Sequence, residues 1–372
     1  MDVNSAVLSR YSEGASEKQE ALCCPVDYDT KLLDLLPAEI IEKDYGCGDP
    51  SRYVQTGDVV LDLGSGGGKV CYMAAQLVGE AGKVIGIDMN DDMLSLARKY
   101  QEEMSRKLGG NRVEFVKAQI QDLALDIIEM ETWLSNNPVT DANGARQFEQ
   151  WKSEQRKNRP LIKNNSVDLV ISNCVLNLVD DEHKKQMVSE IYRVVKPGGR
   201  IAISDIVSDE KVPAHLKENA ELWSGCISGA FEELEIINEF SDAGFQSIKL
   251  DKWSAQPWKI VENIEFRSVT VIATKGDGNE CIDKGHAVIY KGPYSRIKDD
   301  DGHEYFRGER MAVCERTFNY LTLGPLRDDF IGIEPKTTVK PRPWCAPAGT
   351  RRPVRETRGG RHVNKDDGPS CC

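Results

Sequence analysis

The sequence predicts an α/β fold with a mainly parallel sheet, and three observations support this class. From Gly57 onward, short apolar runs alternate with segments whose apolar residues recur at helical spacing, as in consecutive βαβ units. A glycine-rich turn at 64–68 joins the first apolar run to the helix after it. Pro197, Gly198 and Gly199 then end a later helix and turn the chain into another strand.

The first 50 residues are predicted to form a helical cap on the domain that follows. Within them, residues 28–45 place leucine and isoleucine side chains at a loosely helical spacing, which Pro37 interrupts. We therefore expect this segment to pack against the sheet domain.

The main domain is expected over residues 51–275. Its strands are predicted at 58–63, 83–88, 112–116, 167–172, 200–205, 245–250 and 267–274. An insertion at 121–165 separates the third and fourth strands, and its first part, 123–134, is predicted to be helical. The rest of the insertion is polar, and we expect a surface excursion that partly covers the functional site.

A small C-terminal α+β module is predicted over residues 280–338. It offers a strand pattern at 286–291 and a helical pattern at 309–322. From residue 339 the chain is rich in proline, glycine and arginine and poor in apolar residues. This composition predicts a disordered tail, residues 339–372, that ends in two cysteines.

The charge balance excludes several classes of partner. The 372 residues include 48 Lys and Arg against 60 Asp and Glu, a formal net charge of −12. An acidic surface repels phosphate backbones, so no nucleic-acid partner is expected. No stretch approaches the roughly 20 apolar residues of a membrane helix, so no membrane partner is expected. The first 25 residues carry charges and no apolar run, which argues against a secretory signal and predicts a cytoplasmic protein.

The chain contains eleven cysteines. In a cytoplasmic protein they are expected to be reduced thiols, ligands or redox groups more often than structural disulfides. None forms a CxxC pair or the paired spacing of a zinc ribbon, so the sequence predicts no structural zinc site.

The glycine-rich turn is the first candidate binding element. The first strand runs into DLGSGGGK (62–69), with Asp62 leading a D-x-G-x-G-x-G pattern. Glycine lets the backbone turn sharply and approach a ligand closely. The dinucleotide fingerprint has the wider spacing G-x-G-x-x-G, which places a pyrophosphate on a helix N-terminus. The tighter turn and leading acid here favour a ligand with an amino-acid end and no phosphate.

The second strand ends in Asp88, whose carboxylate can accept both hydroxyls of a ribose. Met89 is expected to pack on an adenine ring, and Ile120 and Gln121 to lie near its edge. The alternative is a purely structural turn with a solvated aspartate, which the full strand–turn–helix–strand pattern disfavours. The predicted cofactor contacts are Asp62, Gly64, Ser65, Gly66, Asp88, Met89, Ile120 and Asn173.

These motifs resemble those of class I methyltransferases that bind S-adenosylmethionine. The matching segments are DLGSGGGK (62–69), GIDM (86–89) and PGGRIAISD (197–205). The resemblance implies a Rossmann-like seven-stranded sheet whose last strand is antiparallel. It also implies S-adenosylmethionine as the cofactor.

Three cysteines, Cys71, Cys174 and Cys226, fall where the chain should pass the carboxyl edge of the sheet, where open α/β sheets bind ligands. Cys71 lies in the first turns of the helix after the glycine turn, where the helix dipole favours a thiolate. Cys174 follows the fourth strand, Cys226 comes after the fifth, and Cys47 lies in the cap. Any one of them could be a small buried core residue. Several thiols at one edge nevertheless predict a site for a soft, thiophilic centre.

The cysteine motifs resemble those of the arsenite methyltransferases, over roughly residues 20–275. The matching segments are CCPV (23–26), YGCG (45–48), SNCVLNL (172–178) and LWSGCISGA (222–230). The resemblance implies an enzyme of arsenic detoxification that methylates arsenite or its thiol conjugates. It implies Cys71, Cys174 and Cys226 as arsenic(III) ligands and Cys47 as a redox partner that forms a disulfide. It also implies thioredoxin or glutathione as the thiol reductant.

Arsenic(III) held by three sulfurs keeps a lone pair, which can attack the methyl carbon of a sulfonium directly. No proton leaves this nucleophile, so catalysis needs positioning rather than a general base. Three alternatives remain: another soft acceptor such as selenium, a small organic acceptor, and a non-enzymatic protein that sequesters a metalloid. The vicinal pairs Cys23-Cys24 and Cys371-Cys372 are either capture sites for a thiophilic ion or inert.

Overall fold

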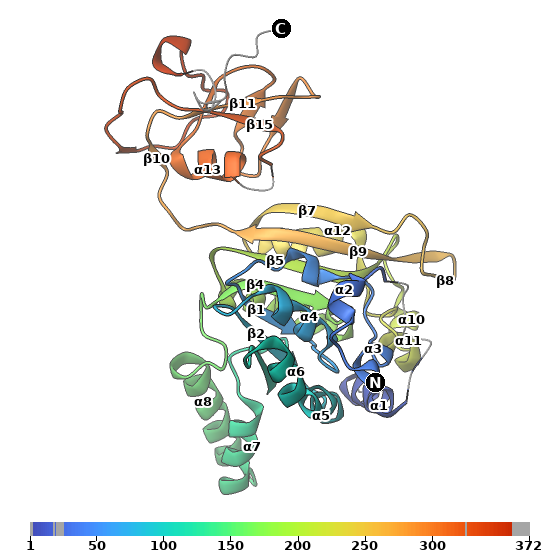
Figure 1. The fold of residues 1–372 in the computed structure, drawn as a ribbon. Helices are drawn as coiled ribbons and strands as arrows, with labels where there is room; N and C mark the ends of the chain where they lie inside the picture. Colours follow the sequence, from blue (N-terminus) through green and yellow to red (C-terminus); the bar gives the residue numbers. More distant parts are fainter. Residues whose placement is uncertain (1–2, 18, 20–25, 324–325, 359–372) are drawn as a thin grey trace. The chain divides into compact units, whose positions relative to one another are not determined.

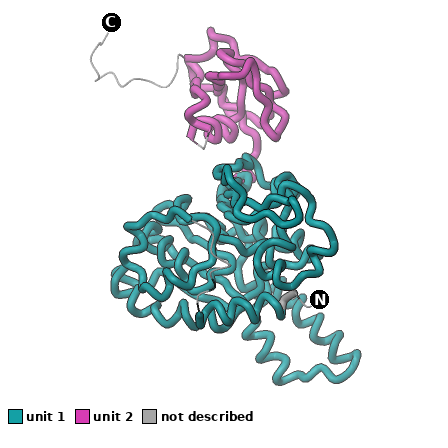
Figure 2. Tube along the Cα trace, turned by 90° about the vertical axis from the view of Figure 1, so that its right-hand side faces the viewer, with its two compact units in different colours: residues 1–276 teal, residues 277–372 magenta. Residues whose placement is uncertain are grey.

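The structure is a computed structural model that describes residues 3–17, 19, 26–323 and 326–358. The chain divides into two compact units, residues 1–276 and 277–372, shown in different colours in Figure 2. Among the described residues, no helix is both long and apolar enough to cross a lipid bilayer.

The first unit contains a mixed sheet, and the predicted α/β class is confirmed. Its main path runs in the order β3-β2-β1-β4-β5-β9-β7, and β9 is antiparallel to both of its neighbours. The strands of this path are β1 (Val59–Leu63), β2 (Lys83–Asp88), β3 (Val113–Lys117), β4 (Val167–Asn173), β5 (Val195–Ser208), β7 (Phe245–Trp253) and β9 (Ile264–Lys275). Two short strands, β6 (Phe231–Glu232) and β8 (Lys259–Val261), extend it beside β5 and β9. All seven predicted strands are therefore present.

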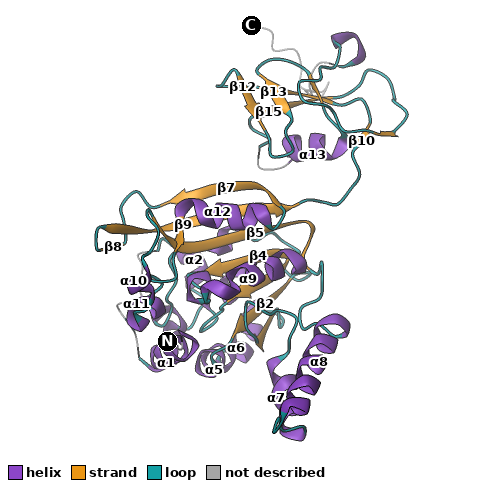
Figure 3. Cartoon of the chain, turned by 180° about the vertical axis from the view of Figure 1, so that it is seen from behind, coloured by secondary structure: helices purple, strands orange, loops and turns teal. Residues whose placement is uncertain are grey.

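Helices cover both faces of this sheet (Figure 3). One face carries α9 (Asp181–Val194) and α12 (Glu233–Asp242), and the other carries α4 (Lys69–Leu77), α5 (Asp91–Lys99) and α6 (Gln101–Leu108). Successive residues of a strand point to opposite faces. In β1, Leu61 and Leu63 accordingly pack into one apolar cluster and Val60 into the other. Asp62 is therefore a carboxyl group in a strand that is buried on both faces.

The N-terminal segment contains α1 (Val3–Ser16), α2 (Thr30–Leu33), α3 (Ala38–Glu42) and the 3-10 turn η2 (Pro50–Tyr53). Pro37 caps α3 and so separates two short helices inside the segment that we expected to be loosely helical. Helix α1 lies in the predicted cap but outside the 28–45 pattern, and it packs against α5 and against α11 (Ala220–Ser224).

The insertion forms a helical hairpin on the surface: the helix expected at 123–134 begins at Ile127, and the rest of the excursion contains a second helix that the sequence did not predict. It consists of α7 (Ile127–Asn136) and α8 (Ala142–Asn158), and Figure 1 shows it projecting from the sheet. Trp133 stacks on Phe148 and Trp151, each with ring centroids 5.5 Å apart, which gives this polar stretch a local reason to be helical. None of the described residues 122–165 lines the cavity described below, so the hairpin does not cover it.

Removing this hairpin is expected to leave cofactor binding intact. Backbone bonds from Leu161 to Ala124 (3.1 Å) and from Ile162 to Leu123 (2.9 Å) hold its base closed. A Gly-Ser linker in place of residues 127–155 should therefore bind the cofactor with a Kd within about twofold of the intact chain. Calorimetric titration of both proteins measures this, and a loss of affinity of about tenfold or more would contradict it.

The second unit is built from short strands around one helix. Its elements are β10 (Ile282–Asp283), β11 (Ala287–Tyr290), β12 (Arg296–Lys298), β13 (Glu304–Phe306), β14 (Met311–Ala312), α13 (Glu315–Leu323), β15 (Phe330–Ile333), β16 (Arg342–Pro343) and the 3-10 turn η4 (Val354–Glu356). The helix predicted at 309–322 begins only at Glu315, because β14 pairs with β11 instead.

Residues 339–358 belong to this unit, so the predicted disorder from residue 339 was wrong for them. β16 pairs with β10, and the buried carboxylate of Asp283 accepts hydrogen bonds from Arg342 and Arg352. Cys281 and Cys345 form a disulfide across the same region. Arg342 and Arg352, whose segment was predicted to be disordered, are thus bound to the buried carboxylate of Asp283. The cysteine pairs Cys23-Cys24 and Cys371-Cys372 lie outside the described residues.

Candidate functional site

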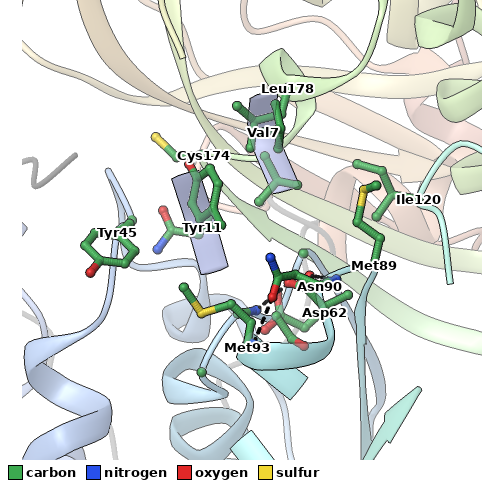
Figure 4. Close-up of a pocket in the computed structure, with 18 of the residues that line it drawn as sticks. Val7, Tyr11, Tyr45, Asp62, Met89, Asn90, Met93, Ile120, Cys174 and Leu178 are labelled. Atoms are coloured by element: carbon green, nitrogen blue, oxygen red, sulfur yellow. Dashed lines mark hydrogen bonds between the residues drawn. The ribbon is translucent and has the colours of Figure 1, made fainter. Parts of the chain in front are cut away.

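A cavity lies at the carboxyl ends of β1, β2 and β4, and side chains from several elements surround it (Figure 4). Every residue that the sequence predicted as a cofactor contact lines it: Asp62, Gly64, Ser65, Gly66, Asp88, Met89, Ile120 and Asn173. Gln121 lines it as well. The structure therefore brings this whole set of candidate residues together around one space.

The glycine turn needs its glycines. Gly64, Gly66 and Gly68 have φ angles of 68°, 50° and 86°, which side-chain-bearing residues rarely adopt. A Cβ on Gly64 would lie 2.4 Å from a methyl carbon of Val175, in the loop that carries Cys174. The turn and the cysteine loop are thus packed directly against each other.

Two carboxyl groups flank the turn. Asp62 is 2% exposed, and burial raises its pKa to about 7. Asp88 accepts hydrogen bonds from the backbone N–H groups of Gly66 and Asn90, both at 2.8 Å, while burial raises its pKa. Ser65 contributes a buried hydroxyl that has no hydrogen-bond partner within the described structure. A ligand bound in the cavity can supply the acceptor that this hydroxyl lacks.

Helix α1 closes one side of the cavity with Val7, Leu8 and Tyr11. The side chain of Asn90 donates to the Leu8 carbonyl (3.1 Å) and to Ser12 Oγ (3.0 Å), which ties the helix to the end of β2. A second set of hydrogen bonds joins the helix to α11. Arg10 donates to the carbonyl of Glu221 and to Ser224 Oγ, at 2.8 and 3.0 Å. Sequence reasoning missed this wall, although the apolar residues of α1 recur at helical spacing.

Three of the four candidate cysteines meet beside this cavity. Cys47 and Cys174 form a disulfide, with Cα atoms 5.8 Å apart, and Cys174 lines the cavity. The sulfur of Cys226 lies 3.4 Å from the carbonyl oxygen of Cys174 and 4.0 Å from the hydroxyl of Tyr11. Cys47 from the cap, Cys174 from the end of β4 and Cys226 from the loop after α11 thus belong to one buried cluster, here called the sulfur cluster.

Cys174 and Cys226 both have left-handed backbones, with φ angles of 60° and 61°. Such a conformation costs about 1–3 kcal/mol in a residue with a side chain and is concentrated at functional sites. Both cysteines therefore occupy positions where the backbone conformation alone would favour glycine.

Cys71 does not join this cluster. It is completely buried in the core between α4 and the sheet, and its sulfur donates to Asp62 Oδ2 at 3.1 Å. Burial raises the pKa of its thiol well above the ordinary value, and the neighbouring carboxyl groups of Asp62 and Asp88 raise it further. The expectation that the helix dipole favours a thiolate here was wrong, because burial and these acids outweigh the dipole.

Asp205, in the last third of β5 and the final residue of the strand predicted at 200–205, is a residue of this site that sequence reasoning missed. A carboxylate oxygen of Asp205 and the sulfurs of Cys47 and Cys174 all lie within 4.8 Å of one another. The carboxyl group accepts hydrogen bonds from the backbone N–H groups of Ile206 (2.8 Å) and Leu176 (2.9 Å). Burial raises its pKa to about 7. Its position could have identified it, since it ends the predicted strand 200–205 at the same sheet edge as Asp62 and Asp88.

The amide of Asn173 holds the cap against the cysteine loop. Its oxygen accepts from the backbone N–H groups of Cys47 (2.8 Å) and Gly48 (2.9 Å), and its nitrogen donates to the Gly48 carbonyl (2.8 Å). The nitrogen also donates to the hydroxyl of Tyr28 at 3.1 Å. Asn173 thus sets the distance between Cys47 and Cys174, in addition to lining the cavity.

Replacing Asn173 with alanine is expected to weaken the Cys47–Cys174 disulfide. The substitution leaves buried N–H groups without acceptors, at a cost of about 1–3 kcal/mol. The equilibrium constant for disulfide formation should then fall by roughly one order of magnitude. Equilibration in glutathione redox buffers, followed by alkylation and mass spectrometry, measures this constant. Asn143→Ala, on the exposed face of α8, is the control, and equal constants for both variants would contradict the expectation.

Family models match both units. One described as a methyltransferase domain matches residues 55–148 and 144–256, and one described as a domain of unknown function (DUF8838) matches residues 277–362. The first match covers strands β1 to β7 and the glycine turn, but not β8, β9 or α1.

Individual proteins match over most of the chain. An arsenite methyltransferase of Aquipseudomonas alcaligenes is 31% identical, over 83% of this chain and 84% of that protein. The arsenite methyltransferase of Homo sapiens is 34% identical, over 81% of this chain and 74% of that protein. Among solved structures, an arsenic (III) S-adenosylmethionine methyltransferase from Chlamydomonas reinhardtii matches with a TM-score of 0.57 and 27% identity. That alignment covers 88% of this chain and 99% of the algal chain.

Proposed function

Because the chain belongs to the arsenite methyltransferase family, we propose that it transfers the methyl group of S-adenosylmethionine to trivalent arsenic held by Cys174 and Cys226. One observation carries this proposal. The sulfur cluster lies beside a cavity that every predicted cofactor contact lines, so acceptor and donor sites share the wall formed by Cys174.

The residues of the cavity suit S-adenosylmethionine. When bound, this cofactor supplies an electrophilic methyl group on a sulfonium. The unpartnered hydroxyl of Ser65 and the glycine turn offer polar contacts for its amino-acid end. Asp88, oriented by two backbone N–H groups, can accept the ribose hydroxyls. Met89 and Ile120 supply an apolar wall for the adenine.

The sulfur cluster suits arsenic(III) as substrate, because soft thiolates select soft centres. Each arsenic–sulfur bond forms as a hydroxide of arsenous acid leaves as water with the thiol proton. The bound arsenic keeps its lone pair, which forms the new bond to the methyl carbon as the carbon–sulfur bond of the donor breaks. No histidine lines the cavity within the described residues, which agrees with a reaction that needs no general base.

The protein therefore contributes to the reaction by positioning the arsenic and by excluding water from the cavity. The left-handed backbones of Cys174 and Cys226 fix the two sulfurs, and α1 covers the cavity from outside with Val7 and Leu8. Cys71, implied as a third ligand by the resemblance, is held in the core by its bond to Asp62. In this conformation the nearest further sulfur is that of Cys47.

Methyl transfer leaves arsenic pentavalent, and its two-electron reduction by the thiols of Cys47 and Cys174 would form the Cys47–Cys174 disulfide, an oxidised state that cannot hold arsenic through Cys174. Its reduction takes two electrons and two protons, and we propose a thiol such as glutathione or thioredoxin as their source. This requirement also supports the cytoplasm, where thiols are kept reduced, as the place of action.

The proposal is tested by incubating the pre-reduced protein with S-adenosylmethionine and arsenite. Arsenic species are separated by chromatography with elemental detection, and S-adenosylhomocysteine is counted in the same samples. The expected result is a methylarsenical formed together with S-adenosylhomocysteine. Arsenite that is bound but never methylated would support sequestration instead. Methyl transfer only to selenite or to an organic acceptor, in parallel reactions, would replace arsenic as the acceptor.

A further inference from the structure

The second unit carries a cysteine pair that the proposed reaction does not use. Cys281, just before β10, and Cys345, just after β16, form a disulfide with Cα atoms 5.2 Å apart. Cys281 is partly exposed and Cys345 is exposed, whereas Cys47 and Cys174 of the sulfur cluster are both buried. Solutes can therefore reach the pair in the second unit without entering the cofactor cavity.

We propose that Cys281 and Cys345, in their dithiol form, bind a trivalent arsenical that has two exchangeable ligands, namely arsenite or its monomethylated form. The class of ligand rests on the proposed function, which makes arsenic the substrate. The site itself takes no part in methyl transfer, since the described residues that line the cofactor cavity all belong to the first unit. The second unit is then a place where the arsenic substrate binds outside the cavity.

The dithiol form follows from the exposure of the pair. In the cytoplasm proposed above, thiols keep accessible cysteines reduced. A thiol such as glutathione attacks one sulfur of the Cys281–Cys345 bond, and a second thiol molecule completes the exchange. Two molecules of thiol are oxidised to one disulfide, and their two protons and two electrons restore both cysteine thiols.

The two cysteines stay adjacent when the disulfide opens, because other bonds hold their strands together. β10 pairs with β16, and the backbone N–H of Trp344 donates to the Cys281 carbonyl at 2.7 Å. Asp283, which is 1% exposed, accepts hydrogen bonds from Arg342 at 3.0 Å and from Arg352. Separating the strands would leave this carboxylate buried without its partners, which is strongly unfavourable. The dithiol is therefore preorganised for a ligand that bridges it.

The charges beside the pair suit thiolates. The guanidinium groups of Arg342 and Arg352 outnumber the single carboxylate of Asp283. Both also lie over the ring of Trp344, at 5.7 and 5.0 Å from its centroid. Nearby cations favour the thiolate form of cysteine, which is the form that binds soft centres.

The binding step balances without any change of oxidation state. Each cysteine sulfur forms a bond to arsenic while one hydroxide of arsenous acid leaves as water with the thiol proton. Two arsenic–sulfur bonds replace two arsenic–oxygen bonds, and the third substituent of arsenic remains. This substituent is hydroxide for arsenite and methyl for the monomethylated form. A dimethylated arsenical has only one exchangeable ligand and cannot bridge the pair, so the site distinguishes arsenicals by their methylation state.

The first test uses the wild-type chain and needs no variant. The full-length protein is reduced with tris(2-carboxyethyl)phosphine, desalted without oxygen, and incubated with arsenite, methylarsonous acid or dimethylarsinous acid. N-ethylmaleimide is then added, and mass spectrometry of the peptides gives the alkylation rates of Cys281 and Cys345. Arsenite and methylarsonous acid are each expected to slow both rates by about tenfold or more, because the two sulfurs chelate one arsenic. Dimethylarsinous acid should slow them by less than about twofold.

The second test asks whether both sulfurs bind the same arsenic. In Cys345→Ser, arsenite should no longer protect Cys281, and in Cys281→Ser it should no longer protect Cys345. Cys314→Ser is the matched control, because Cys314 is a buried cysteine of the same unit, and it should keep the wild-type protection. Methylation at saturating arsenite should stay within about twofold of wild type in the Cys281→Ser/Cys345→Ser double variant.

Three results would overturn the proposal. One is an alkylation rate in the wild type that arsenite leaves unchanged, and another is protection of Cys281 that survives in Cys345→Ser. The third is a pair that stays disulfide-bonded in a glutathione buffer of cytoplasmic potential. Failure of the proposed function is a separate result. If arsenite protects the pair but the reduced wild type makes no methylarsenical, the proposed function fails while the site stands.

Discussion

Cys174→Ser and Cys226→Ser are each expected to lower the rate of arsenite methylation by about a hundredfold or more, because each removes one of the two sulfurs that position the arsenic. Serine has nearly the same size but offers a hard, weakly binding oxygen. The arsenic would then be held through fewer bonds and away from the methyl carbon. Pre-reduced proteins, arsenite at saturation and chromatographic detection of methylarsenicals give the rates.

The affinity for S-adenosylhomocysteine should stay close to wild type in both variants, since neither sulfur belongs to the set proposed to bind the cofactor. Cys314→Ser is the matched control, because Cys314 is equally buried but lies in the second unit. Undiminished arsenite methylation by either Cys174→Ser or Cys226→Ser would remove that residue from the proposed ligand set. A parallel loss in Cys314→Ser would point to a general loss of folding instead.

Asp88→Ala is expected to raise the Kd for S-adenosylmethionine by about a hundredfold or more. Hydrogen bonds to a charged group contribute about 1.5–3 kcal/mol each, and the ribose offers two hydroxyls to this carboxylate. The variant also frees the backbone N–H groups of Gly66 and Asn90, which Asp88 now holds. Isothermal titration calorimetry with S-adenosylmethionine measures the effect.

Two variants make this result specific. Asp88→Asn keeps an acceptor without the charge, so its affinity should lie between those of wild type and Asp88→Ala. Asp92→Ala removes an exposed carboxylate four residues away and should change little. If Asp88→Ala binds the cofactor as tightly as Asp92→Ala, the ribose assignment is wrong.

The glycine turn and the strands around it could be predicted because their signals are local. Apolar runs, turn residues and a strand-terminal acid such as Asp88 report on their own surroundings, and the parallel sheet brings strand ends to one edge. Cys174 and Cys226 follow strands or lie in loops at that edge, which is why the sequence brought them together correctly.

The parts that could not be predicted depend on contacts between distant segments. Cys71 is close in sequence to the glycine turn, but the rotation of α4 places its sulfur against Asp62 in the core. In the sequence, Asp205 is only the last residue of a predicted strand. Its place in the site depends on the loop that brings Cys47 close to it. That fold-over depends on one amide, Asn173, whose partners lie more than 120 residues away in the chain. Pairing of Cys47 with Cys174 has the same origin.

Helix α1 connects the cofactor end of the cavity to the side that carries the cysteines. The helix is bound to the cofactor end of the cavity through Asn90 and to α11, just before Cys226, through Arg10. Because one helix contacts both ends of the cavity, movement of α1 at the cofactor end also affects the side that faces Cys226. We therefore expect exchange of the spent cofactor and exchange of the methylated product to be coupled through this helix.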